Sequence, residues 1–261
     1  MTLTESAIVM DNLTKKFEDV TAVDGLSLEV EKGELFGLLG PNGAGKTTVI
    51  NMLCGLIKPT SGSVVVGGLD VQKDLYKVKE VIGVCPQETA IYPYLTGLEN
   101  IDLFGNLHAM NKDVLKVRRG ELLEKMGLVE DAKRRAGKYS GGMKRRLSLA
   151  LALIHDPQIA FLDEPTVAMD PQSRHAVWDF IKELKREGKT TVLTTHYMEE
   201  AEELCDRVGI IDHGKVIALG SPEELILSND VKNLEEVFIK LTGRRIREGD
   251  INELPTSLCP Y

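Results

Sequence analysis

The sequence lacks long apolar runs and is poor in cysteine, and both absences exclude classes of protein. No window of the 261 residues approaches the roughly 18 uncharged apolar residues of a membrane-spanning helix, so we expect no transmembrane segment. Residues 1–5 have neither the basic nor the apolar character of a secretory signal, and we expect none. The four cysteines lie far apart without CxxC spacing, and the five histidines show no metal-ligand spacing. These patterns predict reduced thiols in a cytosolic protein rather than a zinc or disulfide framework.

An excess of positive charge is also missing. The formal net charge is −8, which argues against a nucleic-acid partner because such partners usually require a basic face. Hydrophobic residues make up 43% and charged residues 28%, as in ordinary globular proteins. The length suits one large domain or two small ones.

What the sequence does contain is a glycine-rich loop after a short apolar run at residues 35–39. From Gly40 to Thr47 the loop fits G-x-x-x-x-G-K-[ST], the phosphate-binding P-loop. Its glycines let the backbone turn N–H groups toward phosphate oxygens, because glycine tolerates positive φ and has no Cβ in the way. Lys46 supplies a positive charge for the β- and γ-phosphates, and the Thr47 hydroxyl suits Mg²⁺. The motif therefore predicts that the chain binds a nucleoside phosphate.

The residues after this loop are spaced as in an amphipathic helix. The apolar positions that recur at helical spacing are Val49, Met52, Leu53 and Leu56. Such a helix would direct the positive end of its dipole at the phosphates. The alternative is an accidental glycine-rich turn, and the strand before and the helix after argue against it.

Two acids follow a second apolar run, at residues 159–162. A carboxylate such as Asp163, fixed at the end of a buried strand, suits a Mg²⁺ ligand. Its neighbour Glu164 can polarise a water for attack on the γ-phosphate. Taken alone, both acids could simply cap the next helix. Beside a P-loop we favour the catalytic interpretation.

A further glycine pair precedes a helical pattern within residues 139–143. Ser140, Gly141 and Gly142 at a helix N-terminus form a second anion-binding device, which uses backbone N–H groups and the helix dipole. The alternative is a capped junction between a loop and a helix. The position shortly before the two acids favours anion binding.

Strand and helix patterns alternate along most of the chain. The expected strands cover residues 7–10, 25–30, 35–39, 62–68, 81–85, 159–162, 191–194, 208–211 and 215–217. Helical periodicity fills residues 98–153, and a further amphipathic helix lies between the strands at 159–162 and 191–194. This order predicts an α/β fold with a parallel sheet covered on both faces. After Ser221-Pro222 we expect a charged tail with one helix, residues 234–241.

Taken together, these motifs resemble the ATP-binding subunit of an ABC (ATP-binding cassette) transporter. The resemblance covers residues 6–225 and rests on residues 40–48 (Walker A), Gln87 (Q-loop), residues 139–143 (signature), residues 159–164 (Walker B), residues 167–170 (D-loop) and His196 (switch). A P-loop alone would also fit kinases and GTPases, whereas this ordered set is specific.

The resemblance implies a P-loop NTPase core with a mainly parallel sheet, an N-terminal antiparallel β subdomain and an inserted α-helical subdomain at about residues 90–157. It divides the chain into a nucleotide-binding domain, residues 1–225, and a tail with one short helix, residues 226–261. It also implies ATP and Mg²⁺ as cofactors and a homodimer formed on ATP binding. A separate transmembrane permease subunit would hold the chain at the cytoplasmic face of the cell membrane.

The resemblance further assigns roles to individual residues. The catalytic set is Lys46, Glu164 and His196, and the metal set is Thr47, Gln87 and Asp163. The nucleotide-binding set is Phe17, Gly40, Pro41, Asn42, Gly43, Ala44, Gly45, Lys46, Thr47, Thr48, Ser140, Gly141 and Gly142. In this scheme Phe17 stacks on adenine, Gln87 senses Mg²⁺ and the γ-phosphate while linking to the membrane subunit, and His196 contacts the γ-phosphate. Outside this context Phe17 would be a core residue, Gln87 an ordinary loop residue and His196 a histidine with satisfied hydrogen bonds.

Three positions depart from the family pattern. Tyr139 and Met143 replace the leucine and glutamine that usually open and close the signature. The D-loop begins with Val167 where a serine is usual, which puts one polar contact across the dimer in doubt.

Residues 194–202, 211–215 and 234–238 resemble exporter ATPases whose membrane subunit is a separate polypeptide. We expect the charges of the acidic run at residues 199–203 to face solvent.

Three alternative functions fit the sequence less well. Ribosome- or DNA-directed ABC ATPases carry two cassettes or long coiled coils, and this chain has neither. The second alternative is a P-loop GTPase or a small-molecule kinase, but the guanine-reading Asn-Lys-x-Asp of GTPases fails in residues 111–114 at the last position, Val114. The intact Glu164 and His196 disfavour a catalytically silent cassette. The sequence therefore favours an ATPase that powers export.

Overall fold

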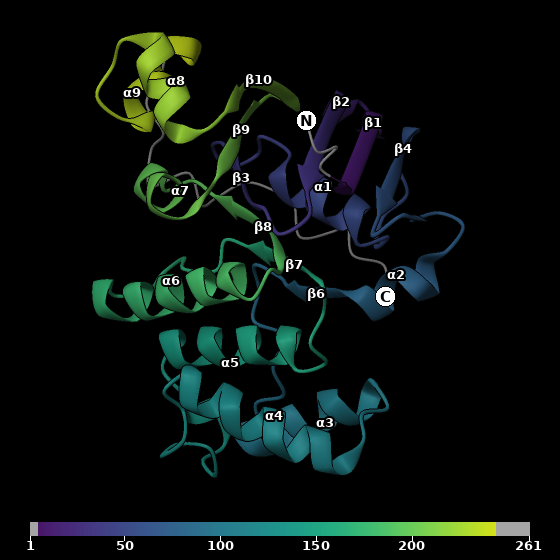
Figure 1. Ribbon diagram of the computed structural model, residues 1–261, viewed down its shortest axis with the longest axis vertical. Helices are drawn as coiled ribbons and strands as arrows, with labels where there is room; N and C mark the ends of the chain where they lie inside the picture. The colour runs from purple at the N-terminus through teal and green to yellow at the C-terminus, as the bar shows by residue number, and fades with distance from the viewer. Residues whose placement is uncertain (1–4, 244–261) are drawn as a thin grey trace.

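The computed structural model describes residues 5–243, which are built on two sheets (Figure 1). The first sheet is antiparallel with strand order β2-β1-β4-β5, and the second has the order β10-β9-β3-β8-β7-β6. The strands are β1 (Ser6–Phe17), β2 (Val20–Glu31), β3 (Leu35–Leu39), β4 (Ser61–Val66), β5 (Leu69–Asp70), β6 (Ile82–Cys85), β7 (Ile159–Asp163), β8 (Thr190–Thr195), β9 (Arg207–Asp212) and β10 (Lys215–Gly220). The predicted α/β class, with a mainly parallel core sheet and an N-terminal antiparallel sheet, is confirmed.

The second sheet sets the position of the functional loops. Strands β9, β3, β8, β7 and β6 run parallel, and only β10 is antiparallel to its neighbour. Leu39 of β3 pairs with Thr195 of β8, and Asp163 of β7 pairs with Thr194. Every residue of β3, β7 and β8 is buried, as expected for strands covered on both faces. The loops that follow these strands therefore leave the sheet at one edge.

Helices cover both faces of this sheet. They are α1 (Lys46–Leu53), α2 (Leu75–Val81), α3 (Gly97–Leu107), α4 (Lys112–Lys125), α5 (Gly141–Leu153), α6 (Pro171–Arg186), α7 (Met198–Leu204), α8 (Pro222–Asn229) and α9 (Leu234–Thr242), with a 3₁₀ turn at Ala136–Lys138. None of the helices within residues 5–243 has both the length and the apolarity to cross a bilayer.

Helix α1 packs into the core that the two sheets share. Val49 and Ile50 belong to one buried cluster with residues of the antiparallel sheet and with Phe161 of β7. The helix ends at Leu53. The predicted apolar stripe also included Leu56, which was wrong because Leu56 lies beyond the end of the helix and is 63% exposed. The opposite face of the second sheet packs against α5, α6 and α7, and α3 and α4 lie beyond α5 (Figure 1).

The C-terminal part of the described chain contains two helices: α9 matches the predicted helix at residues 234–241, but α8 was not predicted, so the expected number of one was wrong. Ser221 and Glu224 form a capping box at the start of α8, with Pro222 in the first turn. Only Pro222 and Leu225 of α8 are buried, which leaves almost no apolar periodicity for a sequence pattern to detect. Phe238 of α9 is buried in the same cluster as residues of α5 to α7.

The cysteines of the described residues form no disulfide bond. Cys54, Cys85 and Cys205 are buried free thiols, while Cys259 lies outside the described residues. Burial raises the pKa of all three thiols, which keeps them protonated and unreactive.

Candidate active site

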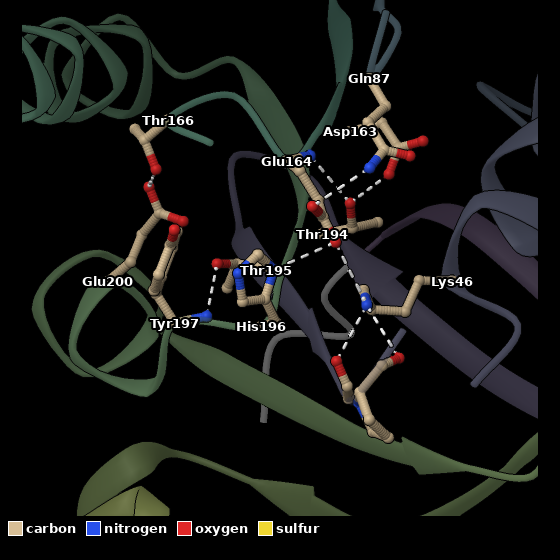
Figure 2. A network of polar contacts seen from close by, with 12 residues as sticks. Lys46, Gln87, Asp163, Glu164, Thr166, Thr194, Thr195, His196, Tyr197 and Glu200 are labelled. Atoms are coloured by element: carbon tan, nitrogen blue, oxygen red, sulfur yellow. Dashed lines mark hydrogen bonds and ion pairs between the residues drawn. The ribbon is translucent and has the colours of Figure 1, made fainter. Parts of the chain in front are cut away.

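Four loops bring the predicted polar residues to one edge of the second sheet. The P-loop follows β3, Glu164 follows β7, His196 follows β8 and Gln87 follows β6. The four strands are adjacent and parallel, so their carboxyl ends meet at that edge. Figure 2 shows the resulting network of side chains around Glu164.

The P-loop depends on glycine at particular points. Gly43 and Gly45 have φ of 79° and 106°, in the region that favours glycine. A Cβ on Gly45 would lie 2.4 Å from the Ala22 carbonyl oxygen, and a Cβ on Gly40 would lie 2.3 Å from that of Ile211. Side chains at these positions would thus collide with backbone that cannot yield.

The ammonium of Lys46 is buried inside this loop. Its Nζ donates to the carbonyl of Gly40 at 2.8 Å and to that of Pro41 at 3.1 Å. It also lies 3.3 Å from Oε1 of Glu164. Burial lowers the pKa of Lys46, and the charge of Glu164 opposes this effect.

Glu164 is the centre of the network. Its Oε1 lies 3.3 Å from Nδ1 of His196, and its Oε2 accepts from Nε2 of Gln87 at 3.4 Å. Burial acts to raise the pKa of Glu164, but the hydrogen bond from His196 and the charge of Lys46 outweigh it and hold the pKa below its usual range. The carboxylate is therefore ionised and able to accept a proton, as a base requires.

The backbone of Glu164 is strained in a way that fits a functional position. Its φ is 48°, which is uncommon for a residue with a side chain. The N–H donates to the backbone and side-chain oxygens of Thr194, at 3.1 Å and 3.0 Å. Neighbouring structure thus fixes a conformation that the residue alone would avoid.

Asp163 lies beside Thr47 and Thr194. Its carboxylate accepts hydrogen bonds from both hydroxyls. Burial raises the pKa of Asp163, and these two hydrogen bonds oppose the shift. Hydroxyl and carboxylate oxygens side by side suit Mg²⁺, which protein sites hold through one or two such ligands together with phosphate oxygens. In the described part of the chain no cluster of three or more His, Cys, Asp or Glu side chains could hold a metal without such help.

The signature residues do not join this network. Ser140 caps α5, with its Oγ accepting from the N–H of Met143 at 3.2 Å. A Cβ on Gly142 would lie 3.4 Å from Oγ of Ser173 on α6, and a Cβ on Gly141 would meet no heavy atom within 4 Å. Tyr139, which departs from the family pattern, is buried and donates from its hydroxyl to the Asp131 carbonyl at 2.8 Å.

Phe17 lies at the end of β1 with 39% of its surface exposed. The Nζ of Lys15 is 4.8 Å from the centroid of its ring. An exposed aromatic with a cation beside it is a usable stacking surface rather than a core residue. Of the remaining predicted contacts, Ala44 is buried with its carbonyl accepting from Gly214, while Asn42 and Thr47 are exposed.

Glu200 was misjudged from the sequence. The acidic run was expected to face solvent, and Glu199, Glu202 and Glu203 do, but Glu200 is fully buried. Its Oε1 accepts from Trp178 Nε1 at 2.8 Å and from a threonine, Thr166, at 2.7 Å. Burial raises the pKa of Glu200. The only signal available was its place within an otherwise apolar helix face, between Met198 and Ala201.

A second missed residue is Arg145, which donates to the backbone carbonyls of Asp163 and Glu164. Nothing in the sequence marked it, because a basic residue after the signature fits an exposed helix position equally well.

These features define a class of protein. A P-loop, an acid pair at the end of a parallel strand of the same sheet, and a glutamine and a histidine around the second acid are typical of a P-loop NTPase.

Comparison with known proteins identifies the family. The ABC transporter family model matches residues 23–167, and the chain belongs to that family as an ATP-binding subunit. The linearmycin resistance ATP-binding protein LnrL of Bacillus subtilis is 44% identical over 237 residues, which cover 88% of this chain and 76% of that protein. The doxorubicin resistance ATP-binding protein DrrA of Mycobacterium tuberculosis is 42% identical over 249 residues, which cover 91% and 75%.

Solved structures agree with this assignment. The ATP-binding subunit of an ABC transporter superposes with a TM-score of 0.84 at 25% identity, over 91% of this chain and all of that one (100%). The cassette MJ0796, in a dimeric post-hydrolysis state with ADP and Pi, gives 0.75 at 28% identity, over 82% and 98%. The predicted family and ATPase class are confirmed.

Proposed function

We propose that this chain hydrolyses Mg-ATP in a head-to-tail homodimer and thereby drives export through a separate transmembrane subunit. The observation that carries the proposal is the separation of two phosphate-binding devices within one chain. The P-loop and the Ser140–Gly142 turn each present backbone N–H groups at a helix start, and the two turns begin different helices, α1 and α5. A two-fold arrangement would let each chain's turn close its partner's P-loop.

In this proposal the chain's own groups divide the work. Residues 40–48 bind the phosphates, and Lys46 neutralises charge on the β- and γ-phosphates. Glu164 accepts the proton of the attacking water, with His196 and Gln87 beside it to orient the reacting groups. Thr47, Asp163 and Gln87 would hold Mg²⁺, which when bound stabilises charge on the phosphate oxygens.

The nature of the transport reaction is supported by the relatives. The two relatives are named for resistance to linearmycin and to doxorubicin, which supports export of a drug-like compound. With no membrane-crossing helix in residues 5–243, the chain would need a partner for transport and would lie at the cytoplasmic face of the membrane through that partner. We place the membrane contact in the helical segment after Gln87, at about residues 90–157.

Light scattering tests the dimer. Glu164→Gln keeps the shape of the side chain and removes the base, so it should accumulate a dimer with Mg-ATP. Ser140→Arg, added to the same chain, should prevent that dimer because it places bulk where the partner's phosphate would lie. A double variant that still dimerises would exclude the Ser140–Gly142 turn from the interface.

Fractionation of cells tests the membrane partner. The chain should move from the membrane to the soluble fraction when the gene of its transmembrane partner is deleted. Retention at the membrane in the deleted strain would contradict the proposal.

A further inference from the structure

Arg145 is a buried cation whose five N–H groups are all taken by backbone carbonyls. The side chain leaves α5 and is only 3% exposed. Its Nε donates to the carbonyl of Pro165 at 3.0 Å. Its Nη1 donates to the carbonyl of Gln87 at 2.9 Å and to that of Pro86. Its Nη2 donates to the carbonyl of Glu164 at 2.8 Å and to that of Asp163. A guanidinium has five N–H donors, so none is left without an acceptor. In the described part of the chain Arg145 forms no ion pair with a carboxylate.

The five carbonyls come from the two segments that carry the candidate site. One segment is the end of β6 with Gln87, and the other runs from Asp163 through Glu164 to Pro165. Carbonyl oxygens that converge in this way repel one another unless a cation lies between them. The planar fork of arginine can meet acceptors in two directions at once, which the three donors of a lysine ammonium cannot do in the same geometry.

The contact also supports the strained residue of the site. Thr194 holds the N–H of Glu164, and Arg145 holds its carbonyl at 2.8 Å. The N–H and the carbonyl on either side of the strained Glu164 φ of 48° are thus both held by groups from other elements. A loss of either contact frees the backbone that aims the Glu164 carboxylate at Gln87 and His196.

The neighbouring Arg146 gives a contrast on the same helix. Its guanidinium donates to the carbonyl of Met126, near the end of α4, and to no residue of the candidate site. Arg146 therefore ties α5 to the end of α4, while Arg145 ties α5 to the loops at the edge of the sheet.

We propose that Arg145 is a positioning residue that sets Glu164 against Gln87 and couples both to the helix that begins after Ser140. The inference rests on the proposed function, in which Glu164 is the base and Ser140 serves the partner's nucleotide. It adds that the Arg145 guanidinium links Glu164 of its own chain's site to α5, the helix whose first turn would complete the partner chain's site.

The test compares Arg145→Lys with Arg146→Lys in the full chain. For Arg145→Lys we expect kcat for Mg-ATP hydrolysis to fall by roughly 10- to 100-fold, because a misplacement of about 1 Å at a reacting group has effects of that size. KM, and the ATP affinity measured by calorimetry, should stay within about threefold, because the P-loop is untouched. Arg146→Lys should keep kcat within about twofold, because it changes no contact to the site.

A second variant covers the possibility that the buried lysine prevents folding. Arg145→Gln removes the charge, so no unpaired ion is buried, and it keeps two N–H donors. It should show the same split, with a reduced kcat and unchanged ATP affinity. If either folded variant keeps wild-type kcat, or loses ATP affinity in proportion to kcat, Arg145 is not a positioning residue.

Failure of the proposed function would give a different experimental result. In that case Glu164→Gln would keep wild-type turnover whatever the result at Arg145. If Glu164→Gln abolishes turnover while Arg145→Lys and Arg145→Gln do not change it, the proposed function stands and the present inference falls.

Discussion

The Nζ atom of Lys46 lies 3.3 Å from Oε1 of Glu164, and both side chains are almost fully buried. This ion pair connects the loop after β3 to the end of β7, two strands that are separated in the sheet by β8. We expect a phosphate bound by the P-loop to compete with Glu164 for the same ammonium, which would link nucleotide binding to the release of the Glu164 carboxylate through one cation.

Lys46→Ala should weaken ATP binding by about tenfold to a hundredfold. The change removes a charge-assisted contact worth ~1.5–3 kcal/mol. Isothermal titration calorimetry measures the effect, and Lys58→Ala, at an exposed position after α1, serves as the control. An unchanged affinity in the Lys46 variant would contradict the P-loop assignment.

Glu164→Gln should slow ATP hydrolysis by roughly 10²–10⁴-fold while ATP still binds. The amide cannot take the proton of the attacking water, although it fills the same space. Phosphate release under saturating Mg-ATP measures turnover, and calorimetry on the same protein checks binding. Turnover within a factor of about three of wild type would show that another group is the base.

Nucleotide selectivity should be weak. Phe17 offers an aromatic face beside Lys15 and no pattern of hydrogen bonds that distinguishes adenine from guanine. We expect GTP to bind within about one order of magnitude of ATP, since stacking tolerates any base. Competition titrations measure the ratio, and Phe17→Ala should weaken both nucleotides equally. A thousandfold preference for ATP would instead require a base-reading pocket.

Glu200→Ala should lower the free energy of unfolding by about 1–3 kcal/mol, because the donors of Trp178 and Thr166 are left without an acceptor. Glu200→Gln should cost less, since an amide oxygen can still accept at the same place. Urea unfolding followed by the single tryptophan, Trp178, reports the change. Glu199→Ala, which is exposed on the same helix, should stay within about 0.5 kcal/mol.

His155 should make the protein less stable as the pH falls. Its Nε2 lies 2.9 Å from the carbonyl oxygen of Ile82, and its ring stacks on His108 at 3.7 Å between centroids. Burial, and then the charge of His108, lower the pKa of His155 from 6.5 to about 4. Between these values the unfolded chain binds a proton that the folded chain does not, so the free energy of unfolding decreases through that window as acid is added.

His155→Gln removes the titrating group and should flatten this dependence. Urea unfolding at about pH 7.5 and about pH 5 measures the slope in each protein. His213→Asn is the control, because His213 is exposed and asparagine tolerates its φ of 46°. An identical slope in wild type and His155→Gln would show that His155 does not titrate in this range.

Much of the candidate site could be predicted because its parts are local. The stretch from Gly40 to Thr47 encodes its own backbone shape, and Glu164 directly follows an apolar strand. The alternation of strands and helices was enough to predict a parallel sheet, and parallel strands bring such loops to one edge. The order of the motifs along the chain then indicated the family.

Other features could not be predicted because they depend on strand order and burial. Arg145 and Glu200 look like ordinary charges on helices, and the short α8 has almost no apolar pattern. Arg145 receives its five acceptors only because β6 and β7 lie side by side, which brings the carbonyl of Gln87 close to that of Glu164. The sequence thus indicated which groups we propose for the chemistry. The tertiary structure decided which buried charges hold them in place, because a buried ion is stable only where partners from distant segments meet it.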